Sequence, residues 1–180
     1  DLLVSRADAQ KFVEILYRLQ FKQAKAPAEK QIPGISDYFG YDDAADKLVH
    51  VHAHYRLVLG HDLAKNYRLP IEKAYLDSTV QEELFRIPAP EFEFVVFVIR
   101  MVLKHCTWDL AFGSQGRLRE RERDELAYLE ARIDKGRVSQ VVKQFLPYIG
   151  VDLFGSCVKA LEPVCPAWTR MRTAQRLERK

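Results

Sequence analysis

The chain has 180 residues, 48% of them hydrophobic, which is enough for one domain with a sizeable core or for a compact domain with a helical appendage. Charged residues make up 29% and the formal net charge is only +3, so the composition argues against intrinsic disorder and against a surface devoted to polyanions. Three cysteines without a Cys-x-x-Cys spacing fit reduced thiols, and we expect a cytoplasmic protein.

Neither a membrane span nor a secretory signal is predicted. The longest apolar run, residues 94–103, is interrupted by Arg100 and is shorter than the roughly 20 residues that a membrane span requires. Residues 1–6 contain no basic segment followed by an apolar stretch. We therefore expect the protein to have no membrane partner.

The N-terminal part predicts a strand followed by a helix. Asp1-Leu2-Leu3-Val4 has the composition of a short buried strand, and Ser5 three residues before Asp8 is typical of a helix start. The helix is predicted over residues 7–19, and a second strand over residues 21–25. The expected buried face of the helix has i, i+3, i+4, i+7 spacing and consists of Phe12, Ile15, Leu16 and Leu19.

Two alternating segments, residues 36–41 and 47–56, are separated by an acidic turn and predict a β-hairpin. Because side chains alternate along a strand, His50, His52 and His54 point to one side and the residues between them to the other. Three imidazoles are therefore expected on one face of the hairpin.

Beyond residue 57 the strand signals nearly vanish, apart from residues 83–87, and helical patterns dominate. Residues 91–105 are apolar almost all round, which at this length favours a central buried helix. Its least accessible side chains are expected to be Phe94, Val95, Val98 and Met101 or Val102. Further helices are predicted at residues 117–134, 138–146, 152–161 and 166–178.

The expected fold class is α+β. A small mixed sheet with a flanking helix is expected in residues 1–60, and a helical region packed on it in residues 61–180.

Two segments of the first part carry a resemblance to a known family. One is Asp1-Leu2-Leu3-Val4, with a helix and Leu19-Gln20-Phe21 after it, and the other is the strand ending His52-Ala53-His54-Tyr55-Arg56-Leu57. A looser likeness covers PEFEFVVFVIRMVLKH at residues 90–105. Together they resemble the nucleotidyltransferase-like family of bacterial nucleotide and polysaccharide loci, whose members are often joined to a kinase-like domain.

The resemblance implies a set of site residues. A first strand with a Gly-Ser loop and the first Asp of an Asp-x-Asp pair would precede Asp1, which then matches the second Asp. His54 matches the family histidine, and His52 stands where a third carboxylate is expected. The family holds divalent metal with these groups. The resemblance therefore implies that Asp1 and His52 are catalytic residues and that Asp1, His52 and His54 are metal ligands. It also implies a nucleoside triphosphate (NTP) and a divalent metal as cofactors.

The three histidines can also be judged by their chemistry alone. Carboxylate oxygens suit Mg²⁺, whereas imidazole nitrogens suit Zn²⁺ or Ni²⁺. The spacing of the histidines indicates either a transition-metal site or a polar face that hydrogen-bonds to neighbouring loops. Four acids are candidates to replace the missing carboxylate, although the last three first predict a turn: Asp37, Asp42, Asp43 and Asp46.

A nucleotide also needs cations for its phosphates. The substrate-binding candidates are Arg56, Lys65 and Lys104, with Arg68 as a further cation. The alternative for each of them is an ordinary surface charge.

Two functions stay open. One is nucleotidyl transfer from an NTP to an acceptor that the sequence does not name. The other is a non-catalytic relative that binds a ligand or a partner, which His52 in place of an acid favours. The basic tail at residues 168–180 is accompanied by no RNA- or DNA-binding motif, so nucleic acid is not predicted as a partner.

Overall fold

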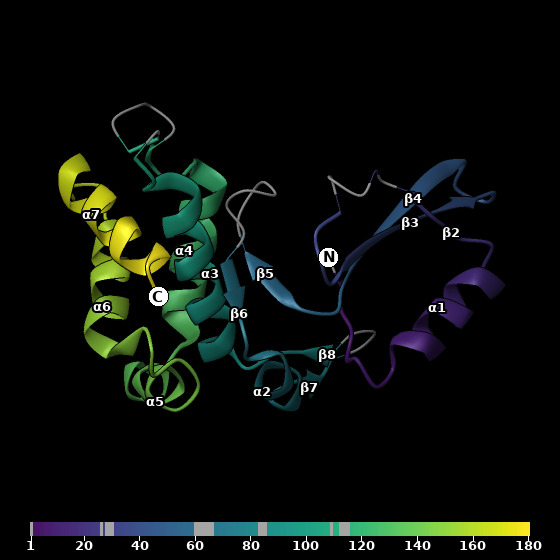
Figure 1. Ribbon diagram of the computed structural model, residues 1–180, viewed down its shortest axis with the longest axis horizontal. Helices are drawn as coiled ribbons and strands as arrows, with labels where there is room; N and C mark the ends of the chain where they lie inside the picture. The colour runs from purple at the N-terminus through teal and green to yellow at the C-terminus, as the bar shows by residue number, and fades with distance from the viewer. Residues whose placement is uncertain are drawn as a thin grey trace. The chain divides into compact units, whose positions relative to one another are not determined.

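The computed structural model describes residues 2–25, 27, 31–59, 67–82, 86–108, 110–111 and 116–180. These residues form two compact units, whose helices and strands are labelled in Figure 1. The first unit contains the described residues within 1–58 and 62–76, and the second those within 59–61 and 77–180.

The first unit is built on a four-stranded sheet with the strand order β1-β4-β3-β2. Its strands are β1 (Leu2–Leu3), β2 (Lys22–Gln23), β3 (Ile35–Asp42) and β4 (Lys47–His54). β1 runs parallel to β4, whereas β4 with β3 and β3 with β2 are antiparallel. The predicted hairpin and the mixed sheet are confirmed, and the strand after Asp1 pairs with the strand that carries the histidines.

Helix α1 (Ala9–Arg18) packs on one face of this sheet (Figure 1). Leu16 is buried with Tyr38 and Ala53 of the sheet. Ile15 and Leu19 are 42% and 61% exposed, so the predicted buried face is wrong at these two positions. The helix ends before Leu19. Its contact with the sheet is centred on Leu16 and includes Phe12, as predicted, together with Val13.

The helix also begins later than predicted. The Asp8 N–H donates to Ser5 Oγ at 3.2 Å, and the Ser5 hydroxyl donates to Asp8 Oδ2 at 2.8 Å. These two bonds close a turn over residues 6–8, and the α-helix starts at Ala9. The Ser5 and Asp8 pattern therefore fixes the turn that leads into α1.

Apart from β8, the short strands that follow were not predicted from the sequence. β5 (Leu57–Leu59) pairs with β6 (Tyr67–Leu69), α2 (Glu72–Asp77) comes next, and β7 (Val80–Gln81) pairs with β8 (Arg86–Ile87). Only β8 falls within the predicted segment 83–87, of which residues 83–85 lie outside the described part. Strands of two or three residues are too short to display an alternating pattern.

The second unit is mainly helical and is organised around α3 (Pro90–His105). Helices α4 (Glu120–Arg132), α5 (Lys135–Phe145), α6 (Gly150–Ala160) and α7 (Ala167–Glu178) each contact α3. Proline at the first position, acids in the first turn and Lys104 with His105 in the last turn all favour this helix. The central buried helix is confirmed, because the side chains predicted to be least accessible are at most 4% exposed: Phe94, Val95, Val98, Met101 and Val102.

Among the residues that the structure describes, no helix combines the length and the apolar character needed to cross a membrane. Cys106, Cys157 and Cys165 are free thiols. Burial raises the pKa of Cys106 and of Cys157 to about 12, so both stay protonated and unreactive at neutral pH.

Candidate functional site

The histidines of β4 lie on the sheet face opposite α1. The register pairs Asp37 with His52 and Phe39 with His50 across the hairpin. Ala53, which lies between two of the histidines, points to the α1 side and is fully buried there. We call the following side chains the histidine face: Asp37, Phe39, His50, His52 and His54.

The rings of the histidine face form a continuous row. Phe39 and His50 stack with their centroids 4.5 Å apart and 7° between their planes. His52 lies 5.9 Å from His50 and 4.5 Å from His54, and it meets His54 edge to face at 65°. These contacts orient the imidazoles on the sheet.

Asp37 supplies the carboxylate of this face. Its Oδ1 lies 2.7 Å from His50 Nε2 and 3.8 Å from His52 Nε2. The side chains of Asp37, His50 and His52 are 41%, 48% and 33% exposed, so solvent reaches all three. Of the four acids considered from the sequence, Asp37 is the one that faces the histidines.

The other acids belong to the turn between β3 and β4. Asp42 Oδ1 accepts the N–H groups of Ala44 at 3.0 Å and Ala45 at 3.1 Å. Asp46 accepts the hydroxyl of Tyr41. The turn chemistry predicted for this acidic segment is confirmed at Asp42, whose side chain accepts backbone N–H groups two and three residues further on.

His54 is the most enclosed imidazole on the histidine face. Its Nε2 is buried and, within the described part of the chain, has no hydrogen-bond partner. Burial and then the neighbouring His52 lower the pKa of His54 to about 4. His54 is therefore neutral at physiological pH, the form in which an imidazole can bind a metal ion.

The described residues contain no group of three His, Cys, Asp or Glu side chains arranged to hold a metal ion. Asp37 and His52 offer one oxygen and one nitrogen, 3.8 Å apart. Asp1, the other predicted ligand and catalytic residue, lies outside the described residues. The described part of the histidine face thus does not form a complete site for the implied metal.

A cavity of about 520 Å³ lies beside the histidine face. Asp37 and His52 are part of its wall, together with Ser36, Gln23 and the segment that contains Gly34. The predicted catalytic residue His52 is thus placed at a cavity with both polar and apolar residues in its wall.

Arg56, predicted to bind phosphate, is not among the wall residues of this cavity but contacts one of them. Gly34 in the cavity wall has a φ of +90°, and a Cβ at this position would lie 2.7 Å from Arg56 Cγ. The Arg56 side chain therefore packs directly on the backbone of Gly34, which only glycine allows here. Lys65, another predicted cation, lies outside the described residues.

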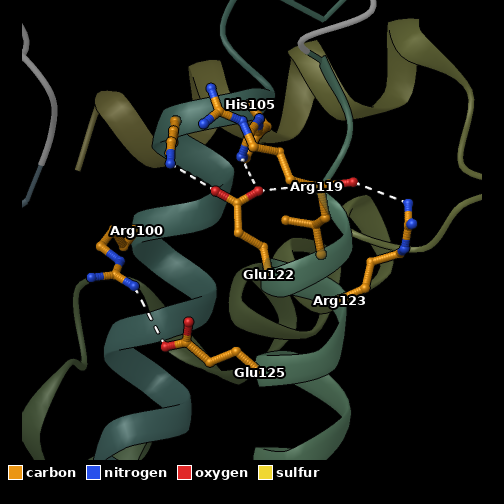
Figure 2. Close-up of polar contacts among 8 residues, drawn as sticks. Arg100, His105, Arg119, Glu122, Arg123 and Glu125 are labelled. Atoms are coloured by element: carbon orange, nitrogen blue, oxygen red, sulfur yellow. Dashed lines mark hydrogen bonds and ion pairs between the residues drawn. The ribbon is translucent and has the colours of Figure 1, made fainter.

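Lys104 lies in the second unit, where its Nζ is 2.7 Å from Glu122 Oε1. The same carboxylate lies 2.9 Å from His105 Nε2 and accepts the Arg119 N–H at 2.8 Å. Figure 2 draws both contacts as dashed lines. Burial opposes the ionisation of Glu122, but the hydrogen bonds from Lys104 and Arg119 outweigh it and lower the pKa to about 2. The structure thus gives Lys104 a structural ion pair and does not bring it into the first unit.

No family model, no curated protein and no solved structure matches this chain.

Proposed function

We propose that the first unit is a nucleotidyltransferase-like domain that binds a nucleoside triphosphate beside the histidine face. The observation that carries this proposal is the register of β3 and β4, which sets Asp37 directly opposite His52. A carboxylate thus stands beside position 52, where the resemblance expects an acid and the chain has histidine. The parallel pairing of β1 with β4 supports the proposal, because the two segments of the resemblance are neighbours in one sheet.

The cavity and its neighbouring cation fit such a ligand. A volume of about 520 Å³ lies within the roughly 300–1,000 Å³ typical of small-molecule pockets. Arg56 packs on Gly34 of the cavity wall, and a guanidinium directed from there toward the cavity would offset phosphate charge. The bound triphosphate would lie between this cation and the histidine face.

Asp37 and His52 can serve the transfer step. An imidazole with a carboxylate beside it accepts a proton from an acceptor hydroxyl, and the carboxylate stabilises the imidazolium that forms. The acceptor oxygen then bonds to the α-phosphorus, the bond to the bridging oxygen breaks, and pyrophosphate leaves. A divalent metal would neutralise phosphate charge when bound.

The second candidate function is ligand binding without catalysis in the same cavity. The 2.7 Å contact between Asp37 and His50 favours it, because this contact engages the carboxylate that proton transfer would use. In that case the cavity binds its ligand without converting it chemically.

Calorimetry and pyrophosphate release on the full-length protein separate the two functions. We expect an NTP to bind in the presence of Mg²⁺, Zn²⁺ or Ni²⁺, and Arg56→Gln to weaken binding about tenfold through the lost charged contact. With water as the acceptor, Asp37→Asn and His52→Gln should each slow pyrophosphate release by about 100-fold while the NTP still binds.

The matched control is Arg18→Gln, which removes an exposed arginine of α1, the helix on the sheet face opposite the histidine face. It should leave NTP binding unchanged. Binding without pyrophosphate release supports the non-catalytic function, and an absence of NTP binding contradicts the nucleotidyltransferase proposal.

A further inference from the structure

The second unit contains a cavity of about 70 Å³ with three arginine side chains in its wall. Arg117 comes from the segment before α4, Arg123 from α4 and Arg170 from α7. Arg123 Nη1 donates to the Leu118 carbonyl at 3.2 Å, which fixes it at the start of α4 (Figure 2). We call this cavity the arginine pocket.

Arg170 is the buried member of the arginine pocket, with only 6% of its surface exposed. Its Nη2 donates to the Ala111 carbonyl at 2.8 Å, while its Nε–H has no hydrogen-bond partner among the described residues. No carboxylate in the described part of the chain forms an ion pair with it. A guanidinium is always charged, and burying a charge without a counterion is energetically costly. A bound anion would therefore stabilise the buried guanidinium of Arg170.

The other two arginines add positive charge at solvent-accessible positions. Arg117 and Arg123 are both exposed and line the same cavity as Arg170. Glu162 is the one acidic side chain among the described wall residues, and it is exposed. Among the described wall side chains, three guanidinium groups face one carboxylate, and the carboxylate of Glu122 next to the wall residue His105 is already paired with His105 and Lys104.

The buried end of the arginine pocket is held by close backbone packing. A Cβ on Gly116, a wall residue, would lie 2.5 Å from the Leu110 carbonyl oxygen and 2.7 Å from that of Ala111. The Ala111 carbonyl also accepts from Arg170. Gly116, Ala111 and Arg170 thus form one packed corner that positions the buried guanidinium before any ligand arrives.

We propose that the arginine pocket binds a phosphate group. A cavity of only about 70 Å³ suits a single tetrahedral oxyanion better than a whole nucleotide. Guanidinium groups recognise phosphate oxygens through paired N–H donors. This site lies in a different unit from the proposed nucleotide site and does not depend on it.

Calorimetry of the full chain in phosphate-free buffer tests the proposal, with inorganic phosphate and O-phosphoserine as the two probes. We expect millimolar or tighter binding that weakens as ionic strength rises. Arg117→Gln and Arg123→Gln should each weaken binding about tenfold, because each removes a charged hydrogen-bond donor. Tighter binding of O-phosphoserine assigns the site to a phosphomonoester and tighter binding of inorganic phosphate assigns it to the free ion, and either supports the proposal.

The matched control is Arg121→Gln, an exposed arginine of α4 that does not line the arginine pocket. It should bind phosphate as the wild type does. A second measurement requires no substitution of the buried Arg170. In protein labelled with ¹⁵N-arginine, the Arg170 Nε–H resonance should shift as phosphate is added. No binding of either probe, equal losses in all three variants, or an unmoved Arg170 resonance would overturn the proposal.

Discussion

Glu122 and Glu125 lie one turn apart on α4 and differ in what surrounds them (Figure 2). Glu122 is buried and receives Lys104, His105 and the Arg119 N–H on its carboxylate. Glu125 is 45% exposed, and its Oε1 lies 3.6 Å from the guanidinium of Arg100. The buried carboxylate therefore contributes to stability in its charged form, whereas the exposed pair contributes little.

We predict that Glu122→Gln lowers the free energy of unfolding at pH 7 by about 2–3 kcal/mol. The pKa of Glu122 is about 2 in the folded protein and its ordinary value is 4.5, so the stabilisation is complete above pH 4.5 and is lost as the pH falls toward 2. Urea unfolding followed by helical circular dichroism should show the difference between wild type and variant shrinking from pH 6 to pH 3.

Glu125→Gln is the control and should change the free energy of unfolding by less than about 0.5 kcal/mol at either pH. A Glu122→Gln effect of the same small size, or one that does not depend on pH, would contradict the stabilising role of this carboxylate.

His54 gives a second prediction at this scale. Its pKa in the folded protein is lowered to about 4 from 6.5, first by burial and then by His52. The neutral imidazole should favour the folded state above pH 6.5, and this contribution should be lost as the pH falls from 6.5 to 4. In a histidine NMR titration we expect a midpoint near pH 4 for His54, and this midpoint should move upward in His52→Gln. A wild-type midpoint near pH 6.5 would contradict the burial of the His54 imidazole.

At the scale of helices and strands, the sequence predicts best where one element buries many side chains. The apolar residues of α3 surround the helix, so its central position could be predicted from composition and length. The short strands β5, β6 and β7 carry two or three residues each, which is too little for periodicity to reveal. In α1 the apolar spacing predicted a helix correctly, but the side of the helix that faces the sheet is decided by tertiary packing.

The central position of α3 leads to a prediction for Met101, which is 1% exposed. Met101→Ala should lower the free energy of unfolding by about 2–5 kcal/mol, because it leaves a cavity among packed helices. Met101→Leu keeps the volume and should cost less than about 1.5 kcal/mol. Both tryptophans, Trp108 and Trp168, belong to the second unit, so their fluorescence during urea unfolding reports on this unit. Equal effects of the two substitutions would argue against a tightly packed site.

For the whole molecule, the sequence identified the histidine face but not its carboxylate. Alternation along one strand places three histidines together, whereas the choice of Asp37 from four acids required the register between β3 and β4. The charge of Lys104 predicted a substrate-binding residue. Its ion pair with Glu122 could not be predicted, because it depends on the packing of α3 with α4. The arginine pocket gathers residues from distant parts of the chain, and no local spacing marks it.

The most direct test of the nucleotidyltransferase proposal is a crystal structure of the full-length protein grown with Mg²⁺ and a non-hydrolysable NTP analogue. We expect the triphosphate in the cavity beside Asp37 and His52, within reach of the Arg56 guanidinium. An analogue bound only at the arginine pocket, or a cavity beside the histidine face that stays empty at saturating analogue, would contradict the proposed function.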